Sequence, residues 1–239
     1  MSDPSLPARQ HLTREFLLDA GFEEMIRRAL PHALILGDDE RKASLRAILE
    51  ARAEHGDGLW LFSYGSLIWN PTFHWYARQV ARIEGWHRAF CLAARGGRGT
   101  PENPAPLLGL MPGGMCTGVG FRIAEDVLER ELDLVWRREM VTAAYIPRWV
   151  TMTDAEGHPS GAAIAFTINP AAPTYAGELN EVEIVRRIVK ARGPMGTCVE
   201  YLLKTRDGLH ALGIADPLVD TVAREVEATL KEGRQAGGR

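Results

Sequence analysis

One glutamate, Glu139, occupies a position where a charged side chain is costly. Leu128, Leu132 and Val135 form an apolar stripe at helical spacing, and Glu139 takes the next position of that stripe. At about 100° per residue, it falls within roughly 20° of Leu128 and Leu132 around the helix axis. A buried carboxyl destabilises a protein unless it is paired or used. Because burial raises the pKa of a carboxyl, this position suits a general base that works near neutral pH.

Two other interpretations of Glu139 stay open from the sequence. The helix is expected to end close by, so the carboxylate would reach solvent or pair with Arg137 or Arg138. Glu129 and Glu131 lie elsewhere on the same helix, roughly 80° from the stripe. We expect these two side chains to be ordinary solvated charges.

A second candidate for chemistry is a strand-to-turn segment, 61–67. A glycine between small and hydroxyl-bearing residues lets the backbone approach a ligand, and successive N–H groups form an anion-binding concavity. Such a turn would bind a carboxylate or stabilise a developing oxyanion. The alternative is a tight turn that leaves a core strand. The candidate residues are Leu61, Phe62, Ser63, Tyr64, Gly65, Ser66 and Leu67.

Other chemistries lack their sequence patterns. The chain has no GxxxxGK[ST], no GxGxxG after a strand, no GxSxG and no HExxH. Its three cysteines form no CxxC and are expected to be buried. We therefore expect any enzymatic activity to use carboxylate and backbone groups without a metal. A net charge of −3 disfavours nucleic acid as a partner.

The elements that must position these residues alternate irregularly along the chain. Strands are predicted at 59–62, 79–94, 107–112, 117–123, 145–153 and 161–168, and a hairpin turn at 154–160 joins the last two. Helices are predicted at 125–142, 181–192, 197–212 and 216–232, with Thr197 and Asp216 as caps. Since the strands come in runs, the pattern favours an α+β fold with a mixed, largely antiparallel β-sheet or barrel flanked by helices.

The N-terminal part is predicted to be a helical extension, residues 1–56. It carries a helix capped by Thr13 that runs to about Leu30, and a second helix from Asp39 to about His55. The main domain is expected to span 57–232, and a disordered tail 233–239. The start has no apolar leader, and no apolar run is long enough for a membrane helix. We expect a cytoplasmic protein without a membrane partner.

Several segments, in order, resemble the ChaC-like γ-glutamylcyclotransferases. The run Phe62–Trp69 is similar to that family's YGSLIW segment, and three further segments follow in the family's order. The pairs Leu132-Asp133 and Arg138-Glu139 resemble its LDxRE segment, with a longer spacing between them. The other two similarities are Arg98-Gly99-Thr100-Pro101, after Gly85-Trp86-His87-Arg88-Ala89-Phe90, and Gly193-Pro194-Met195-Gly196 before Glu200-Tyr201-Leu202.

The resemblance implies an elimination that needs neither metal nor cofactor. The free α-amine of a γ-glutamyl group attacks its own γ-carbonyl, which closes 5-oxoproline and expels the rest of the peptide; glutathione would give 5-oxoproline and Cys-Gly. It implies that Glu139 accepts the proton and that the 61–67 turn binds the γ-glutamyl group. Arg98 would pair with a substrate carboxylate, or be a solvated loop arginine. Tyr175 would donate to the substrate, or be a rim aromatic.

Three departures from the family pattern leave the leaving group open. Ser63 stands where many relatives have glycine, Met140 where lysine is common, and Cys198 lies in a stretch without the usual asparagine. The alternatives are a cyclotransferase for another γ-glutamyl amine or dipeptide, and a non-catalytic γ-glutamyl-binding or regulatory protein. A pure binding protein would have no reason to place Glu139 on an apolar stripe. The sequence does not indicate an oligomeric state.

Overall fold

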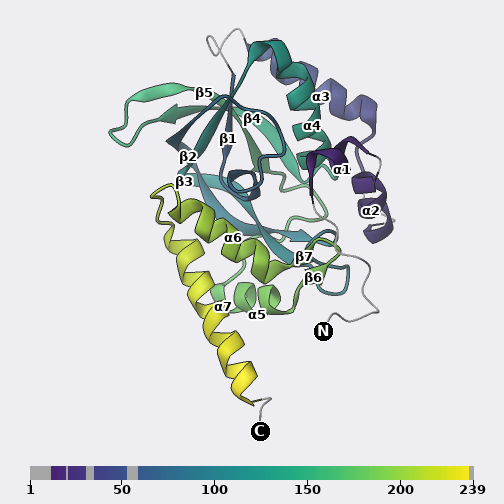
Figure 1. Ribbon diagram of the computed structural model, residues 1–239, viewed down its shortest axis with the longest axis vertical. Helices are drawn as coiled ribbons and strands as arrows, with labels where there is room; N and C mark the ends of the chain where they lie inside the picture. The colour runs from purple at the N-terminus through teal and green to yellow at the C-terminus, as the bar shows by residue number, and fades with distance from the viewer. Residues whose placement is uncertain (1–11, 20, 31–34, 53–58, 237–239) are drawn as a thin grey trace.

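A closed five-stranded β-barrel forms the centre of the computed structural model, which describes residues 12–19, 21–30, 35–52 and 59–236 (Figure 1). The strands follow the order β1-β3-β2-β4-β5, and all pair antiparallel except β1 with β5. The predicted α+β class with a largely antiparallel barrel is confirmed. The strands are β1 (Leu59–Ser63), β2 (Ala77–Ala94), β3 (Ala105–Ile123), β4 (Tyr145–Thr153) and β5 (Pro159–Ile168).

The longest pair, β2 with β3, corrects the prediction of separate strands at 107–112 and 117–123. Gly113 and Gly114 adopt φ values of 94° and 68°, which glycine tolerates and other residues rarely do. The register of the pair shifts between Glu84 and Trp86 on the opposite strand. The two glycines therefore sit in an irregularity that lets β3 continue. The predicted hairpin between β4 and β5 is confirmed.

Helix α4 (Leu128–Glu139) packs against the barrel through its apolar stripe. Leu132, Val135 and Trp136 are almost completely buried, and the Trp136 ring meets Phe166 of β5 edge-on. The helix is shorter than the predicted 125–142, because residues Glu125–Val127 form a 3₁₀ turn and the α-helix ends at Glu139. Glu139 thus lies at the C-terminal end of the helix.

Three C-terminal helices pack together beside the barrel, at the bottom of Figure 1. The N–H of Glu200 donates to the side chain of Thr197, and that of Val219 to Asp216, as the predicted caps require. The last helix continues to Ala236, so residues 233–236 are helical and not disordered; 237–239 lie outside the described residues. The helices are α5 (Glu181–Lys190), α6 (Cys198–His210) and α7 (Pro217–Ala236), with β6 (Arg192–Gly193) and β7 (Gly196–Thr197) between α5 and α6.

The N-terminal extension lies along α4, at the right of Figure 1. Thr13 caps the first helix, but the predicted single helix is two, because α1 ends at Leu18 and α2 begins at Gly21. Residues 53–55, predicted to end the second helical stretch, lie outside the described residues. The helices are α1 (Arg14–Leu18), α2 (Gly21–Ala29) and α3 (Asp38–Glu50).

Candidate active site

Glu139 borders two adjoining cavities. The larger has a volume of about 470 Å³ and the smaller about 30 Å³, and both are also lined by Ser66, Tyr145 and Tyr201. The Glu139 side chain is 15% exposed, so it has left bulk water but still reaches the cavity. Burial raises its pKa above that of an ordinary carboxyl, although Arg138 opposes the shift.

The neighbouring arginine, Arg138, is the partner of this carboxylate. Its Nε lies 3.0 Å from Glu139 Oε1, and its side chain is only 4% exposed. Arg137, the other partner considered from the sequence, faces outward and pairs with Asp133 at 2.9 Å. The Glu139 carboxylate is therefore both desolvated and paired with Arg138. The sequence had presented burial and pairing with an arginine as alternatives for this side chain.

Arg138 also fixes the chain that follows β1. Its guanidinium donates to Ser66 Oγ at 2.8 Å, to the Asn70 carbonyl at 2.6 Å and to Thr72 Oγ1 at 3.2 Å. Ser66 begins η2 (Ser66–Ile68), a single 3₁₀ turn. One side chain thus positions both the candidate base and the turn.

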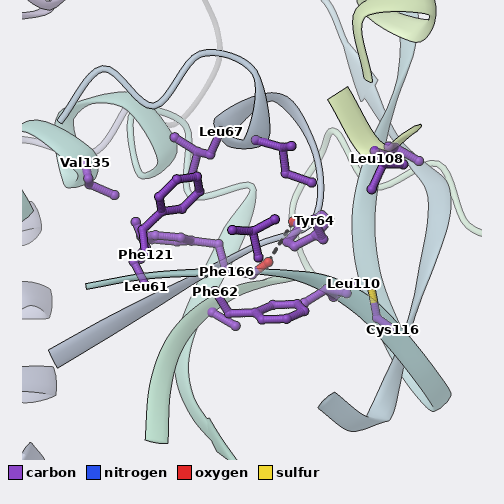
Figure 2. Close-up of a cluster of buried hydrophobic side chains, with 14 of the residues drawn as sticks. Leu61, Phe62, Tyr64, Leu67, Leu108, Leu110, Cys116, Phe121, Val135 and Phe166 are labelled. Atoms are coloured by element: carbon purple, nitrogen blue, oxygen red, sulfur yellow. Dashed lines mark hydrogen bonds between the residues drawn. The ribbon is translucent and has the colours of Figure 1, made fainter. Parts of the chain in front are cut away.

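The predicted binding turn surrounds the smaller cavity with six of its seven residues, 62–67. The exception is Leu61, which is fully buried in the barrel and lines neither cavity (Figure 2). The backbone of the turn is held from β2, because Arg88 Nε donates to the Tyr64 carbonyl at 2.7 Å. Tyr64 Oη donates to the Phe166 carbonyl at 2.8 Å, the dashed line in Figure 2.

Ser63, one of the residues that line the smaller cavity, carries a buried polar atom. The residue is 1% exposed, and its Oγ has no hydrogen-bond partner among the described residues. A buried hydroxyl without a partner costs about 1–3 kcal/mol. A ligand atom in this cavity would give it one.

Two residues at the site were not among the sequence candidates. Tyr145 lines both cavities, and its hydroxyl donates to the Leu108 carbonyl at 3.1 Å. Tyr201 is buried and lines both cavities as well; its Oη accepts the Leu108 N–H at 3.3 Å. Burial raises the pKa of both hydroxyls, so they stay protonated. The sequence alone does not distinguish a tyrosine that lines a cavity from a tyrosine that only packs in the core.

The two remaining candidates, Arg98 and Tyr175, lie in different places. Arg98 lines the larger cavity, where it pairs with Glu200 at 2.8 Å and donates to the Thr197 carbonyl at 3.3 Å. Tyr175 is half-buried, bridges to Leu92 of β2 and lines neither cavity. The fold brings Arg98 to Glu139's cavity and leaves Tyr175 outside it.

Glu131 contradicts its predicted exposure. It is fully buried, and its carboxylate accepts from both terminal nitrogens of Arg14, at 2.5 and 2.9 Å, and from the His74 N–H at 2.9 Å. Burial raises its pKa, but these donors prevail and hold it below the ordinary value. The angle of Glu131 to the apolar stripe of α4 predicted a solvated side chain, because it does not take into account α1, which packs against this side of α4. Glu129 is exposed, as expected.

Across the described ranges, no group of three or more His, Cys, Asp or Glu side chains is placed to hold a metal ion. No helix in the part of the chain that the structure covers is long and apolar enough to cross a membrane.

Comparison with known proteins identifies the family. A family model described as ChaC-like protein matches residues 59–232, which hold the barrel, α4 and the residues around Glu139. The chain belongs to the ChaC-like family. A glutathione-specific γ-glutamylcyclotransferase of Escherichia coli is 37% identical over 92% of this ChaC-like chain and 94% of its own length. A zebrafish (Danio rerio) protein of similar name is 29% identical over 72% of this chain and 91% of its own.

A solved structure supports the fold. The crystal structure of a glutathione-specific γ-glutamyl cyclotransferase from yeast covers 72% of this ChaC-like chain and 97% of its own, with a TM-score of 0.65 and 21% identity. The family-model match excludes the N-terminal extension, whose helices α1 to α3 all end before residue 59.

Proposed function

We propose that this ChaC-like protein is a γ-glutamylcyclotransferase that degrades glutathione to 5-oxoproline and Cys-Gly. The observation that carries the proposal is Glu139, a desolvated carboxylate on the wall of a cavity large enough for a tripeptide. The Escherichia coli relative that bears this activity in its name matches almost the whole chain.

The reaction moves two protons from the attacking nitrogen to the leaving nitrogen. Glu139 takes the first from the α-ammonium of the γ-glutamyl group, and the freed amine nitrogen forms a bond to the γ-carbonyl carbon. The amide C–N bond breaks as Glu139 gives this proton to the nitrogen of the departing cysteinyl residue. Glu139 then accepts the second proton from the ring nitrogen, which keeps one hydrogen as the lactam N–H, and passes it to the amine of Cys-Gly, which leaves as an ammonium. No water is consumed. Because the nucleophile is tethered to its target, the protein mainly has to fold the substrate and move these protons.

The turn 62–67 would hold the γ-glutamyl end. Ser66 and Leu67 lie in the first turn of η2, where a 3₁₀ helix supplies no internal acceptor for their N–H groups. These donors suit the substrate's α-carboxylate or the oxyanion that develops on the γ-carbonyl. Ser63 Oγ, which lacks a partner among the described residues, is a further donor at the same cavity.

Arg98 and Lys204 would serve the other end of the substrate. Both line the larger cavity and pair with opposite oxygens of Glu200, at 2.8 and 2.9 Å. Two cations balanced by one carboxylate leave a net positive charge for the glycine carboxylate of glutathione. Tyr175, outside both cavities, has no contact that supports a substrate role.

The test is a product assay on purified protein with glutathione, without added metal or nucleotide. Wild type should release equal amounts of 5-oxoproline and Cys-Gly. Glu139→Gln keeps the size of the side chain but removes its basicity, so kcat should fall about 10²–10⁴-fold. Glu129→Gln, an exposed change on the same helix, is the matched control and should keep wild-type activity.

Each outcome has a distinct meaning. A folded Glu139→Gln variant with unchanged turnover would overturn the assignment of the base. A wild-type protein that forms no 5-oxoproline from glutathione but does so from another γ-glutamyl amine or dipeptide would overturn the substrate. If no γ-glutamyl compound is turned over but one binds, the protein is a binding or regulatory protein.

A further inference from the structure

The larger cavity has a wall that the family segment does not supply. Five of the residues that line it belong to the N-terminal extension, before the matched range 59–232. The zebrafish relative aligns over 91% of its own length but only 72% of this chain. The wall therefore lies outside the segment shared with this shorter relative, whereas the alignment with the Escherichia coli relative, over 92% of this chain, extends into the extension. Its residues are Leu12, Thr13, Phe22, Ile26 and Leu30.

Partly buried polar contacts hold the Leu12 end of this wall in place. Arg14 binds the fully buried Glu131 through two hydrogen bonds, and it also donates to the Thr72 carbonyl at 3.3 Å. The Leu12 carbonyl accepts from Asn70 Nδ2 at 2.9 Å. Arg138 binds the same segment, through the Asn70 carbonyl and Thr72 Oγ1. The extension is thus connected to the partner of the candidate base.

The wall forms an apolar corner of the cavity. Phe22, Ile26 and Leu30 belong to one hydrophobic cluster with Val141, and Met195 packs against that cluster. All five line the cavity. The cationic side chains of Arg98 and Lys204 line the same cavity. The larger cavity therefore combines an apolar corner with a cationic group.

This combination matches the chemistry of a leaving dipeptide. If the γ-glutamyl end occupies the smaller cavity at Glu139, the rest of the peptide extends into the larger one, which shares Glu139 and Ser66 with it. Cys-Gly carries an uncharged, weakly polar thiol side chain and a carboxylate. The carboxylate suits the cations, and the thiol side chain suits the apolar corner.

We propose that Phe22 and Ile26 of the extension contact the side chain of the first residue of the leaving group and so set the protein's leaving-group preference. This inference rests on the proposed function, because it requires a γ-glutamyl peptide in the cavity. It assigns to α2 a specificity role and no part in the proton transfer.

The experiment compares two substrates that differ only in that side chain. Glutathione and γ-Glu-Gly-Gly have the same γ-glutamyl group and the same terminal carboxylate. An apolar contact with one small group is worth about 10–200-fold in kcat/KM, so wild type should prefer glutathione by a factor in that range. Ile26→Ala should lower the preference about tenfold. The change should appear in KM for glutathione, with γ-Glu-Gly-Gly unaffected.

The same helix offers a matched control in Met25. Met25 and Ile26 are both 7% exposed and belong to the same cluster, but Met25 does not line the cavity. Met25→Ala should destabilise the extension about as much and leave the preference at the wild-type value. If Ile26→Ala does not fold, Ile26→Val and Met25→Leu are compared in the same way, with a smaller effect expected.

The outcomes separate this inference from the function on which it rests. An active wild type whose preference is unchanged in Ile26→Ala, or changed equally in Met25→Ala, would overturn the inference alone. A wild type that releases 5-oxoproline from neither peptide would overturn the proposed function and the inference with it.

Discussion

Replacement of Arg138 tests the electrostatics of the site most directly. In Arg138→Gln the carboxylate of Glu139 stays buried but loses the cation 3.0 Å away. Burial raises the pKa of Glu139 and Arg138 lowers it. With the cation gone, the pKa should rise further. A base that holds its proton to higher pH is inactive over a wider range, so the acid limb of the rate profile should move upward.

The size of the movement follows from the distance between the two charges. At 3.0 Å, two unit charges attract by about 5 kcal/mol at an effective dielectric constant of about 20. At about 1.4 kcal/mol per pH unit, this sets an upper limit of about four pH units. The new glutamine still donates a hydrogen bond, and water enters the cavity. We therefore expect the limb to move by about one to three pH units, as is usual for close opposite charges.

The assay is kcat/KM for glutathione as a function of pH, with thermal unfolding as the check on folding. Arg137→Gln is the matched control, because it removes the adjacent, half-buried arginine, which pairs with Asp133. Arg138→Lys keeps the charge, so its acid limb should stay closest to wild type even if kcat falls through the lost contacts to Ser66 and Asn70. An acid limb that does not move in a folded Arg138→Gln protein would refute the reasoning.

Two further changes probe the surroundings of the site. Ser63→Ala removes a hydroxyl that lacks a partner among the described residues, so Tm should stay level or rise while KM for glutathione rises about 2–10-fold; a KM equal to wild type would show that the hydroxyl does not bind substrate. Glu131→Gln breaks the ion pair between Glu131 and Arg14, whose side chain is 20% exposed. Loss of one partner of a fully buried pair costs about 3–5 kcal/mol. Because this pair is only partly buried, the free energy of unfolding at pH 7 should fall by less, about 2 kcal/mol. Because the pKa of Glu131 is lowered by folding, its contribution is present above pH 4.5 and is lost as the pH falls through the folded-state value. Denaturant unfolding across this window should therefore show a smaller acid loss in Glu131→Gln than in wild type.

Much of the fold was accessible from local patterns. The helix caps at Thr197 and Asp216 were predicted because the cap and its N–H partner are three residues apart or fewer. The antiparallel β4–β5 hairpin followed from the turn residues between two apolar segments. The continuity of β3 was missed, because Pro112-Gly113-Gly114 indicates a turn when the opposite strand is unknown.

Site residues could be predicted from the sequence where one helix or strand alone determines the environment of the side chain. The apolar stripe of α4 singles out Glu139 without any knowledge of its neighbours. The same stripe gave the wrong environment for Glu131, because Glu131 is buried by α1. Its partner there, Arg14, lies 117 residues away in the sequence. Tyr145 was overlooked for a related reason. Its place beside Glu139 depends on how β4 meets the end of α4.

The origin of the cavity wall has a consequence for inhibitor selectivity. A compound that fills only the surroundings of Glu139 contacts residues within the segment common to the family. A compound with an apolar arm that reaches Phe22 and Ile26 would gain contacts outside that segment. Since each buried methylene contributes about 0.8 kcal/mol, two or three such groups would separate this protein from short relatives by one to two orders of magnitude in affinity, roughly.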